Sequence, residues 1–345
     1  MRRDWILAVV SVVLFVGVGG WYVVDSRAPE PVPYVVSVAL APPTATIGGL
    51  QMPDPSARTL APYEGYGTWV DVFDFSPPYS GDTPSVTAAD LAEMADAGVR
   101  TVYLQAARLD DRSPGGLEDP WLLADFLFAA EDQGIDVVAW YLPKFEGGDT
   151  DAMRINQMAD FEVFGRRFDG VGVDIEWTRG ADDETRSARL VELSAAIDRD
   201  NPNLPLSAIV LPPVLIEVVN EAFWPGFPWA QIAPHYDVWQ PMSYWSFRSQ
   251  SSGYGDGYTY NEESTRRLRA NIGDPDALVH AIGGIGGVDG IDDPENPQEP
   301  LASIDELERF VESLRDTDAI GGSLYDWATL DDAARARLAT LFADF

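Results

Sequence analysis

From Trp69 to the C-terminus, short apolar segments alternate with longer stretches in which apolar residues recur every three or four positions. A short apolar segment is typical of a buried parallel strand, and the longer period is typical of a helix packed on a sheet. Eight strands are expected, at residues 70–75, 99–105, 135–142, 170–177, 206–211, 238–244, 279–285 and 320–327. Helices are expected at residues 87–97, 120–133, 152–166, 184–198, 261–272, 304–316 and 331–342. A further helix, within 214–234, is interrupted by prolines.

Capping signals support several of these boundaries. Thr87 precedes Asp90 by three residues and Ser303 precedes Glu306 by three, the spacing of a capping box. Successive strand–helix units of this kind predict a (β/α)8 TIM barrel over residues 63–345. A doubly wound open sheet is the alternative, and it is disfavoured because no glycine-rich phosphate loop follows the first strand.

The N-terminus has the pattern of a membrane signal. Arg2 and Arg3 precede an apolar run over residues 5–24, whose length as a helix is roughly 30 Å, the thickness of a hydrocarbon core. A transmembrane helix within 1–24 would keep the arginines in the cytoplasm and the rest of the chain outside it, as a single-pass protein of the cell membrane. The alternative is a cleaved signal peptide, with a cut site near Ala28, and a secreted protein.

Residues 25–62 are rich in proline, which forbids a regular helix. This segment is expected to be a stiff extracytoplasmic linker, with one short strand at 35–40. The predicted organisation is therefore an anchor, a linker and a barrel.

Composition narrows the partners and the chemistry. The net charge of −33 argues against nucleic acid, and the absence of cysteine excludes disulfides and thiolate chemistry. His235 and His280 lack metal-ligand spacing, so neither a metal site nor a cofactor is expected. The acidic residues between 289 and 295 are interpreted as a solvated loop rather than a calcium site.

In a barrel of this type the active site lies at the carboxyl ends of the strands. The candidate site residues are therefore the polar and aromatic residues at or just beyond the expected strand ends: Asp71, Asp74, Gln105, Arg108, Tyr141, Lys144, Asp174, Glu176, Gln240, Tyr244, Tyr325, Asp326 and Trp327.

The fourth expected strand is the most informative, because it ends on two carboxylates. Asp174 and Glu176 are two residues apart, so they point to the same side of the strand, roughly 7 Å from one another. Hydrolysis of glycosidic bonds uses such a pair, in which one carboxyl donates a proton and the other stabilises positive charge. A helix cap or a salt bridge at the strand end is the structural alternative.

The segment 169–176 resembles the D-G-x-D-x-D-x-E signature of family-18 glycoside hydrolases, the chitinase-like enzymes. Asp169, Gly170, Asp174 and Glu176 match the signature, whereas Gly172 stands in place of its middle aspartate. Family-25 lysozyme-like barrels also end their fourth strand in D-x-E, so that relationship stays open.

Two later strands extend the resemblance. Met242 and Tyr244 are similar to the family's M-x-Y-D motif, with Trp245 in place of the aspartate. The segment that ends at Tyr325, Asp326 and Trp327 resembles the family's closing strand, with the tryptophan of the substrate floor one position late.

The resemblance implies hydrolysis of a polysaccharide with N-acetylated amino sugars, in which the acetamido oxygen of the sugar is the nucleophile. Glu176 would be the general acid and base, and Asp174 and Tyr244 would hold the acetamido group. Gly172 would leave space low in the barrel, and Asp71 or Asp74 could supply the missing carboxylate. The candidates for contact with the substrate are Asp74, Gln105, Tyr141, Lys144, Gln240, Met242, Trp245, Tyr325, Asp326 and Trp327.

Aromatic residues crowd the loop after the sixth expected strand, between Trp245 and Tyr260. They would either stack on sugar rings or pack on one another above the barrel. Three functions stay open: a membrane-anchored glycoside hydrolase, a glycan-binding barrel of the cell envelope without activity, and a two-carboxylate glycosidase that acts on another sugar.

Overall fold

The computed structural model describes residues 59–345 except 114, 249 and 285–301. The expected anchor, the expected strand at 35–40, the acidic loop at 289–295 and nearly all of the linker lie outside the described residues. Within those that are described, no helix has both the length and the apolar character needed to cross a membrane.

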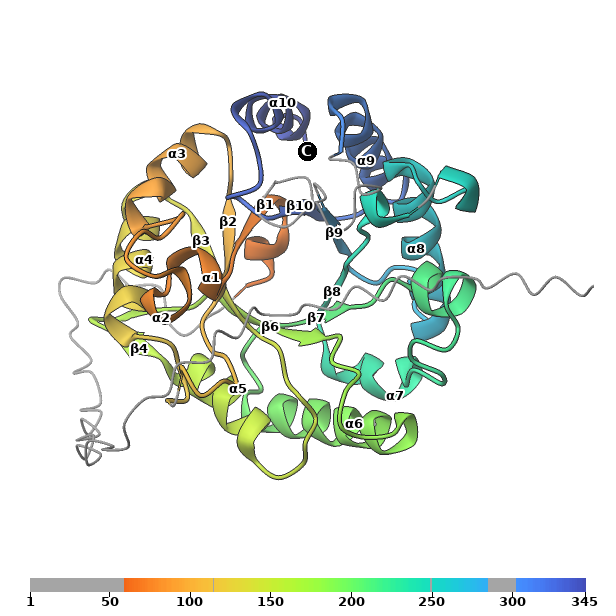
Figure 1. Ribbon diagram of the computed structural model, residues 1–345, viewed down its shortest axis with the longest axis horizontal. Helices are drawn as coiled ribbons and strands as arrows, with labels where there is room; N and C mark the ends of the chain where they lie inside the picture. Colours follow the sequence, from red (N-terminus) through yellow and green to blue (C-terminus); the bar gives the residue numbers. More distant parts are fainter. Residues whose placement is uncertain (1–58, 114, 249, 285–301) are drawn as a thin grey trace, which may run out of the picture. The chain divides into compact units, whose positions relative to one another are not determined.

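Eight parallel strands form the centre of the molecule, in the order β8-β7-β6-β3-β2-β1-β10-β9 (Figure 1). The barrel closes where β8 meets β9, through the Trp239 N–H, which donates to the Leu278 carbonyl at 2.9 Å, and the Ser243 N–H, which donates to the Ile282 carbonyl at 2.8 Å. The strands are β1 (Gly65–Val70), β2 (Thr101–Gln105), β3 (Asp136–Tyr141), β6 (Gly170–Ile175), β7 (Leu206–Val210), β8 (Val238–Pro241), β9 (His280–Gly284) and β10 (Gly321–Tyr325). The predicted (β/α)8 barrel is thereby confirmed.

The helices surround the strands (Figure 1). The longer helices are α3 (Leu91–Asp96), α4 (Pro120–Gln133), α5 (Thr150–Asp160), α6 (Asp183–Asp200), α8 (Gly257–Ile272), α9 (Ile304–Asp316) and α10 (Asp332–Phe342). Short helical turns are α1 (Val72–Phe75), α2 (Pro77–Ser80) and α7 (Trp229–Ile232), with a π-helical turn at Leu215–Val219. The expected helices at 120–133 and 304–316 have the bounds that were predicted, since Asp119 and Ser303 cap them.

The first strand was placed wrongly, because it begins at Gly65 and ends at Val70 rather than running over 70–75. Asp71 starts helix α1 instead: its carboxylate accepts from the Phe73 N–H at 2.7 Å, and Asp74 accepts from the Asp71 N–H at 3.1 Å. This capping box turns the chain at the barrel mouth. The true strand was hidden by its glycines, and Gly67 is one that cannot carry a side chain, since a Cβ there would lie 2.6 Å from the Tyr103 ring.

The expected helix at 152–166 also ends early, at Asp160. A two-stranded antiparallel hairpin follows, made of β4 (Glu162–Val163) and β5 (Arg166–Arg167), with Gly165 at φ 81° between them. A left-handed residue of this kind fits a tight turn and not a helix.

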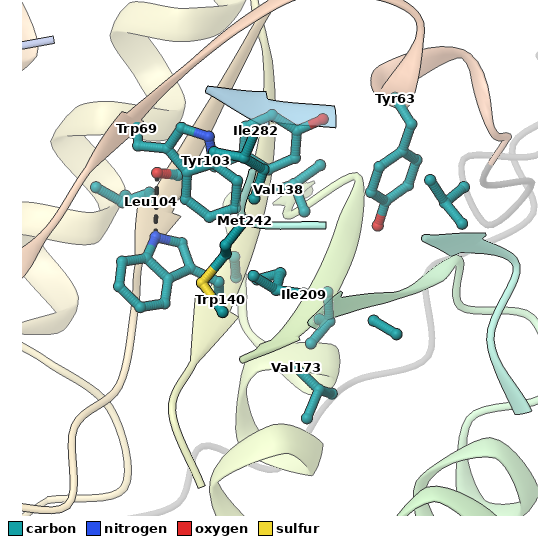
Figure 2. Close-up of a cluster of buried hydrophobic side chains, with 14 of the residues drawn as sticks. Tyr63, Trp69, Tyr103, Leu104, Val138, Trp140, Val173, Ile209, Met242 and Ile282 are labelled. Carbon is teal, nitrogen blue, oxygen red and sulfur yellow. Dashed lines mark hydrogen bonds between the residues drawn. The ribbon is translucent and has the colours of Figure 1, made fainter. Parts of the chain in front are cut away.

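Side chains fill the barrel interior (Figure 2). The rings of Trp69 and Tyr103 stack with centroids 4.5 Å apart, and the Trp140 indole N–H donates to the Tyr103 carbonyl at 3.2 Å. Met242, a candidate for substrate contact, is buried in this cluster. Any ligand site is therefore confined to the mouth, as in other barrels of this class.

Candidate active site

Asp174 is the fifth residue of β6, and Glu176 lies just beyond the end of that strand. Asp174 is buried, and its Oδ1 has no hydrogen-bond partner in the described part of the protein. Glu176 is partly exposed. Burial raises the pKa of both carboxyls, and the negative charge of Glu176 raises the pKa of Asp174 further. A carboxyl whose pKa is raised keeps its proton closer to neutral pH, which a general acid requires.

The other matched residues of the strand motif have structural roles. The Asp169 carboxylate accepts from the Val137 N–H at 2.8 Å and so ties the start of β6 to β3. Gly170 leaves room for Tyr63, whose hydroxyl would lie 2.3 Å from a Cβ at this position. Asp169 and Gly170 therefore fix the position of β6. Asp174 and Glu176, at the other end of the strand, have no such structural role among the described residues and are the candidates for catalysis.

Gly172 does not leave the space that was expected. A Cβ at this position would lie 2.9 Å from Ile209 Cδ1 and 3.1 Å from Ser207 Oγ. Both residues belong to β7, so the neighbouring strand fills the volume that an aspartate would need. Asp174 therefore has no carboxyl beneath it on its own strand.

Tyr244 follows β8 and lies among the acidic groups of the mouth. Its pKa is raised, first by burial and then by the negative charges of Glu176, Asp174, Asp326 and Asp71. Gly284, the last residue of β9, makes room for the ring, since a Cβ there would lie 2.9 Å from a ring carbon of Tyr244. The phenol is thus held as a neutral hydrogen-bond donor next to the predicted acid pair.

A second acidic group lies across the mouth. Carboxylate oxygens of Asp71, Asp74 and Asp326 lie within 4.8 Å of one another. Asp71 and Asp74 belong to the start of α1, which follows β1, and Asp326 follows β10, the neighbour of β1 in the barrel. Burial raises the pKa of Asp71, and its hydrogen bond from the Tyr325 hydroxyl lowers that pKa in part. From the sequence, Asp71 was expected at a strand end and as a replacement for the missing carboxylate, and the misplaced first strand hid its position as the cap of α1.

This group has the spacing of a cation site, but donors already face each carboxylate. Tyr325 donates to Asp71 at 2.5 Å, the Ser85 hydroxyl donates to Asp74 at 2.9 Å, and the Thr329 N–H donates to Asp326 at 3.0 Å. The hydrogen bonds account for the arrangement without a metal ion.

The two candidate glutamines lie below the mouth. Gln105 Oε1 accepts from the Val72 N–H at 3.1 Å, and this bond fixes the turn from β1 into α1. Gln240 is fully buried in β8. Both are inside the protein, so we leave them out of the proposed site.

Three aromatic candidates turn away from the mouth. The buried Tyr141 hydroxyl donates to Asp151 at 2.6 Å, at the start of α5. Trp245 is fully buried, and its ring stacks on Phe310 of α9 at 5.4 Å. Trp327 is also buried, with the Arg335 guanidinium 3.9 Å from its ring centre. These side chains support the barrel wall.

The aromatic loop is largely packed on itself and on its neighbours, the second of its two expected roles. Tyr260 is buried against Tyr254 at 6.0 Å, and the Tyr258 hydroxyl donates to Asp316 at 2.8 Å. Phe247 is the exposed member, and its ring lies 5.7 Å from that of Tyr244.

Lys144 lies at the mouth, where its ammonium nitrogen is 5.3 Å from the centre of the Trp177 ring. The Arg179 guanidinium is 5.5 Å from the centre of the same ring. Neither Trp177 nor Arg179 was a candidate from the sequence, although they lie one and three residues beyond Glu176.

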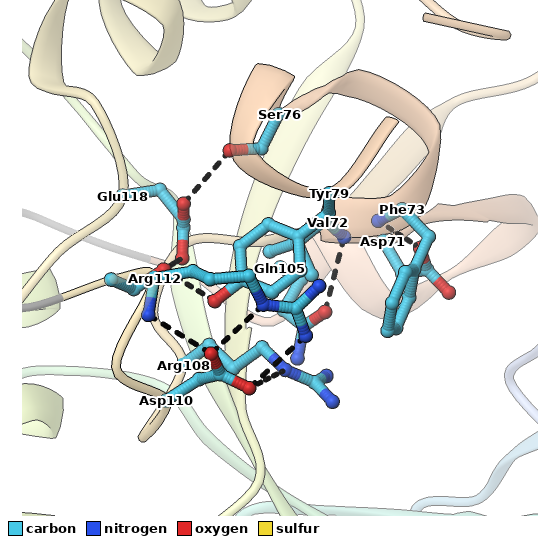
Figure 3. Close-up of polar contacts among 11 residues, drawn as sticks. Asp71, Val72, Phe73, Ser76, Tyr79, Gln105, Arg108, Asp110, Arg112 and Glu118 are labelled. Atoms are coloured by element: carbon cyan, nitrogen blue, oxygen red, sulfur yellow. Dashed lines mark hydrogen bonds and ion pairs between the residues drawn. The ribbon is translucent and has the colours of Figure 1, made fainter. Parts of the chain in front are cut away.

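A second rim of the mouth is built by α1, α2 and the segment after β2 (Figure 3). The Arg108 guanidinium lies 4.8 Å from the centre of the Phe73 ring, and that of Arg112 lies 4.1 Å from the Tyr79 ring. Asp110 accepts from Arg112 at 3.0 and 3.1 Å, whereas its pair with Arg108 is 4.0 Å long. Only Arg108 of this group was a candidate from the sequence.

Comparison with known proteins extends the structural description. No protein-family model matches the sequence, and a search of curated proteins gives no match either. The fold, however, is similar to those of solved carbohydrate-active enzymes. A class V chitinase from Pseudomonas fluorescens matches with a TM-score of 0.57 and 11% identity, over 80% of this chain and 98% of that one.

Two further structures broaden the comparison. A GH18 chitinase from Pseudoalteromonas aurantia matches with a TM-score of 0.52 and 11% identity, over 81% of this chain and 99% of that one. An endo-1,4-β-mannanase from Rhizomucor miehei matches with a TM-score of 0.56 and 9% identity, over 81% and 94%.

The chain therefore has the fold of the glycoside hydrolase barrels. A GH18 chitinase is among these structures, and family 18 is the family that the strand motifs resemble. At these identities the likeness establishes the fold and leaves the substrate to be argued from the site.

Proposed function

We propose that the chain is a glycoside hydrolase that acts on a polysaccharide with N-acetylated amino sugars. Glu176 would protonate the leaving oxygen and then activate water. Asp174 and Tyr244 would hold the acetamido group, whose oxygen attacks the anomeric carbon, so that the protein itself needs no nucleophile. The supporting observation is the mouth itself: two adjacent carboxyls with raised pKa values beside the half-buried phenol of Tyr244.

We further propose that residues 1–24 anchor the protein in the membrane and that the barrel acts outside the cytoplasm. The apolar run behind Arg2 and Arg3 supports this. A polysaccharide of the cell envelope would then be within reach of the barrel.

A glycan-binding barrel without activity is the second candidate. The observation that favours it is Gly172, because neighbouring side chains fill the place of the motif's middle aspartate. A third candidate, an ordinary two-carboxylate glycosidase, would use Asp74 or Asp326 as the partner of Glu176. The charge of Asp326 raises the pKa of Tyr244, as that of Glu176 does, and carboxylate oxygens of Asp74 and Asp326 lie within 4.8 Å of one another.

The test is product analysis with N-acetylglucosamine polymers, peptidoglycan and neutral glucans, using the wild-type chain and Glu176→Gln. Hydrolysis of an N-acetylated polymer by the wild type alone supports the proposal. No activity on any polymer would support the binding barrel. Activity that survives in Glu176→Gln would remove the assigned acid.

A further inference from the structure

Three side chains at the mouth form a group that the proposed chemistry does not use. Lys144 and Arg179 lie against the Trp177 ring, at 5.3 and 5.5 Å from its centre. We call these three residues the cationic shelf. Since Trp177 directly follows Glu176, the shelf adjoins the proposed acid.

Strand register gives the height of the shelf. Tyr141 of β3 pairs with Val173 of β6, and Lys144 and Glu176 each lie three residues beyond this pair. Lys144 and Glu176 therefore lie at the same height above the carboxyl ends of β3 and β6, which are adjacent strands. A saccharide whose scissile bond reaches Glu176 would pass next to Lys144.

The two cations of the shelf have no acidic partner among the described residues. In the part of the chain that the structure describes, neither Lys144 nor Arg179 has an ion pair or a side-chain hydrogen bond, and Trp177 is their contact. Acidic residues outnumber basic ones by 56 to 23, so partners are plentiful. Nearby Arg186, for comparison, donates to Asp183 and to the Thr178 carbonyl.

A cation that rests on an aromatic ring is held in place while its N–H donors stay available. Lysine offers three donors and arginine five, and their bonds to a carboxylate are stronger than bonds between neutral groups. We infer that the shelf binds a carboxylate carried by the saccharide, so that the substrate is an acidic polysaccharide. This inference rests on the proposed function and narrows it from N-acetylated polymers to those that also carry carboxylates.

Arg108 is a further cation near the cationic shelf, and it follows β2, the neighbour of β3 in the barrel. It lies three residues beyond Gln105, the end of β2, and its charge lowers the pKa of Asp71. The distant part of the overall charge of −33 opposes binding of an anion here only weakly, because charges more than about 8 Å away are largely screened at physiological ionic strength.

The experiment measures binding without turnover, by calorimetry with the full-length chain that carries Glu176→Gln. Three oligosaccharides of equal length are compared: a neutral N-acetylglucosamine oligomer, one that alternates N-acetylglucosamine with a uronic acid, and a peptidoglycan glycan strand with free lactyl carboxylates. The acidic ligands should bind more tightly than the neutral one, and Lys144→Gln or Arg179→Gln should each weaken them by roughly three- to tenfold.

Two control variants make the result specific. Arg199→Gln removes an equal charge from α6, where the arginine is exposed and paired with Asp200, and it should leave all three affinities unchanged. Arg179→Lys keeps the charge and should retain most of the affinity. Whichever acidic oligosaccharide binds more tightly shows whether the recognised carboxylate belongs to a uronic acid or to a lactyl group.

The outcomes separate the two proposals. Equal affinity for neutral and acidic oligosaccharides, unchanged in the shelf variants, would overturn the inference even if the wild type hydrolyses neutral polymers. Absence of hydrolysis by the wild type, with binding of acidic ligands that depends on Lys144 and Arg179, would overturn the proposed hydrolase and support carboxylate recognition.

Discussion

The Tyr325 hydroxyl donates a hydrogen bond of 2.5 Å to Asp71, and this bond joins the ends of β10 and β1 at the barrel mouth. The Tyr325 ring also lies 6.1 Å from that of Tyr244. Both phenols lie close to the acidic residues of the mouth, since the pKa of Tyr244 is raised by burial and by the charges of Glu176, Asp174, Asp326 and Asp71, and that of Tyr325 by burial and by the charges of Asp71 and Asp326. Phenols are neutral donors at physiological pH, so they add no further negative charge to carboxylates that already repel one another.

The first prediction concerns the proposed acid. Glu176→Gln keeps the size of the side chain and removes its proton, so kcat on an active polymer should fall roughly 10²- to 10⁴-fold. Glu184→Gln, which removes a carboxylate from the first turn of α6, is the matched control and should keep full activity. Steady-state kinetics and a thermal unfolding curve for each variant distinguish lost chemistry from lost fold.

Asp174→Asn should stabilise the protein at neutral pH. The folded-state pKa of Asp174 is raised, so ionisation works against folding, and stability declines as the pH rises from the unfolded value of 3.8 toward the raised value. The neutral amide removes this penalty. The unfolding temperature of the variant should exceed that of the wild type at pH 8, and the difference should shrink below pH 4.

A constant difference between the two unfolding curves at every pH would contradict this prediction. Activity should fall in the same variant, because a carboxylate that would stabilise positive charge is gone. Stability and catalysis are then opposed at Asp174, as is common at active sites.

Gly172→Asp, which restores the middle aspartate of the resembled signature, should destabilise the fold. The new Cβ would lie 2.9 Å from Ile209 Cδ1, and overpacking of this kind costs about 1–3 kcal/mol. Adding Ile209→Ala opens the space, so the double variant should recover part of the loss. Chemical denaturation of both variants measures the effect, and a double variant no more stable than the single one would argue against the clash.

Two tryptophans should respond in opposite ways to substitution. Trp245→Ala removes a fully buried ring and should cost about 3–5 kcal/mol of stability. Trp177→Ala should change stability much less, because that ring is partly exposed, but it should weaken ligand binding by releasing Lys144 and Arg179. Unfolding and calorimetry on both variants test this, and equal losses of stability would contradict it.

The pattern of apolar and polar positions was sufficient to predict the barrel, because buried parallel strands and amphipathic helices differ in period. The pair Asp174 and Glu176 was also accessible, since it ends an apolar strand. What the pattern missed depends on contacts between distant segments. Gly65 and Gly67 hid β1, and their role is visible only beside Arg100 and Tyr103.

The same limit explains the aromatic candidates. A strand end carries side chains that face the mouth and others that face the helices, and an error of one position exchanges them. Trp245 packs on α9 and Trp327 packs under Arg335, so neither reaches the mouth. Conversely, nothing in the local sequence marks Arg179 as a partner of Trp177.

The filled volume beside Gly172 limits how this protein can change. Because Ile209 and Ser207 already occupy the position, an aspartate at residue 172 cannot be added without disturbing β7. A descendant would first have to carry a smaller residue at 209 and tolerate the resulting void. The acid pair is thus limited to Asp174 on β6 and Glu176 just beyond it, and new specificity is more accessible through the residues that surround the mouth.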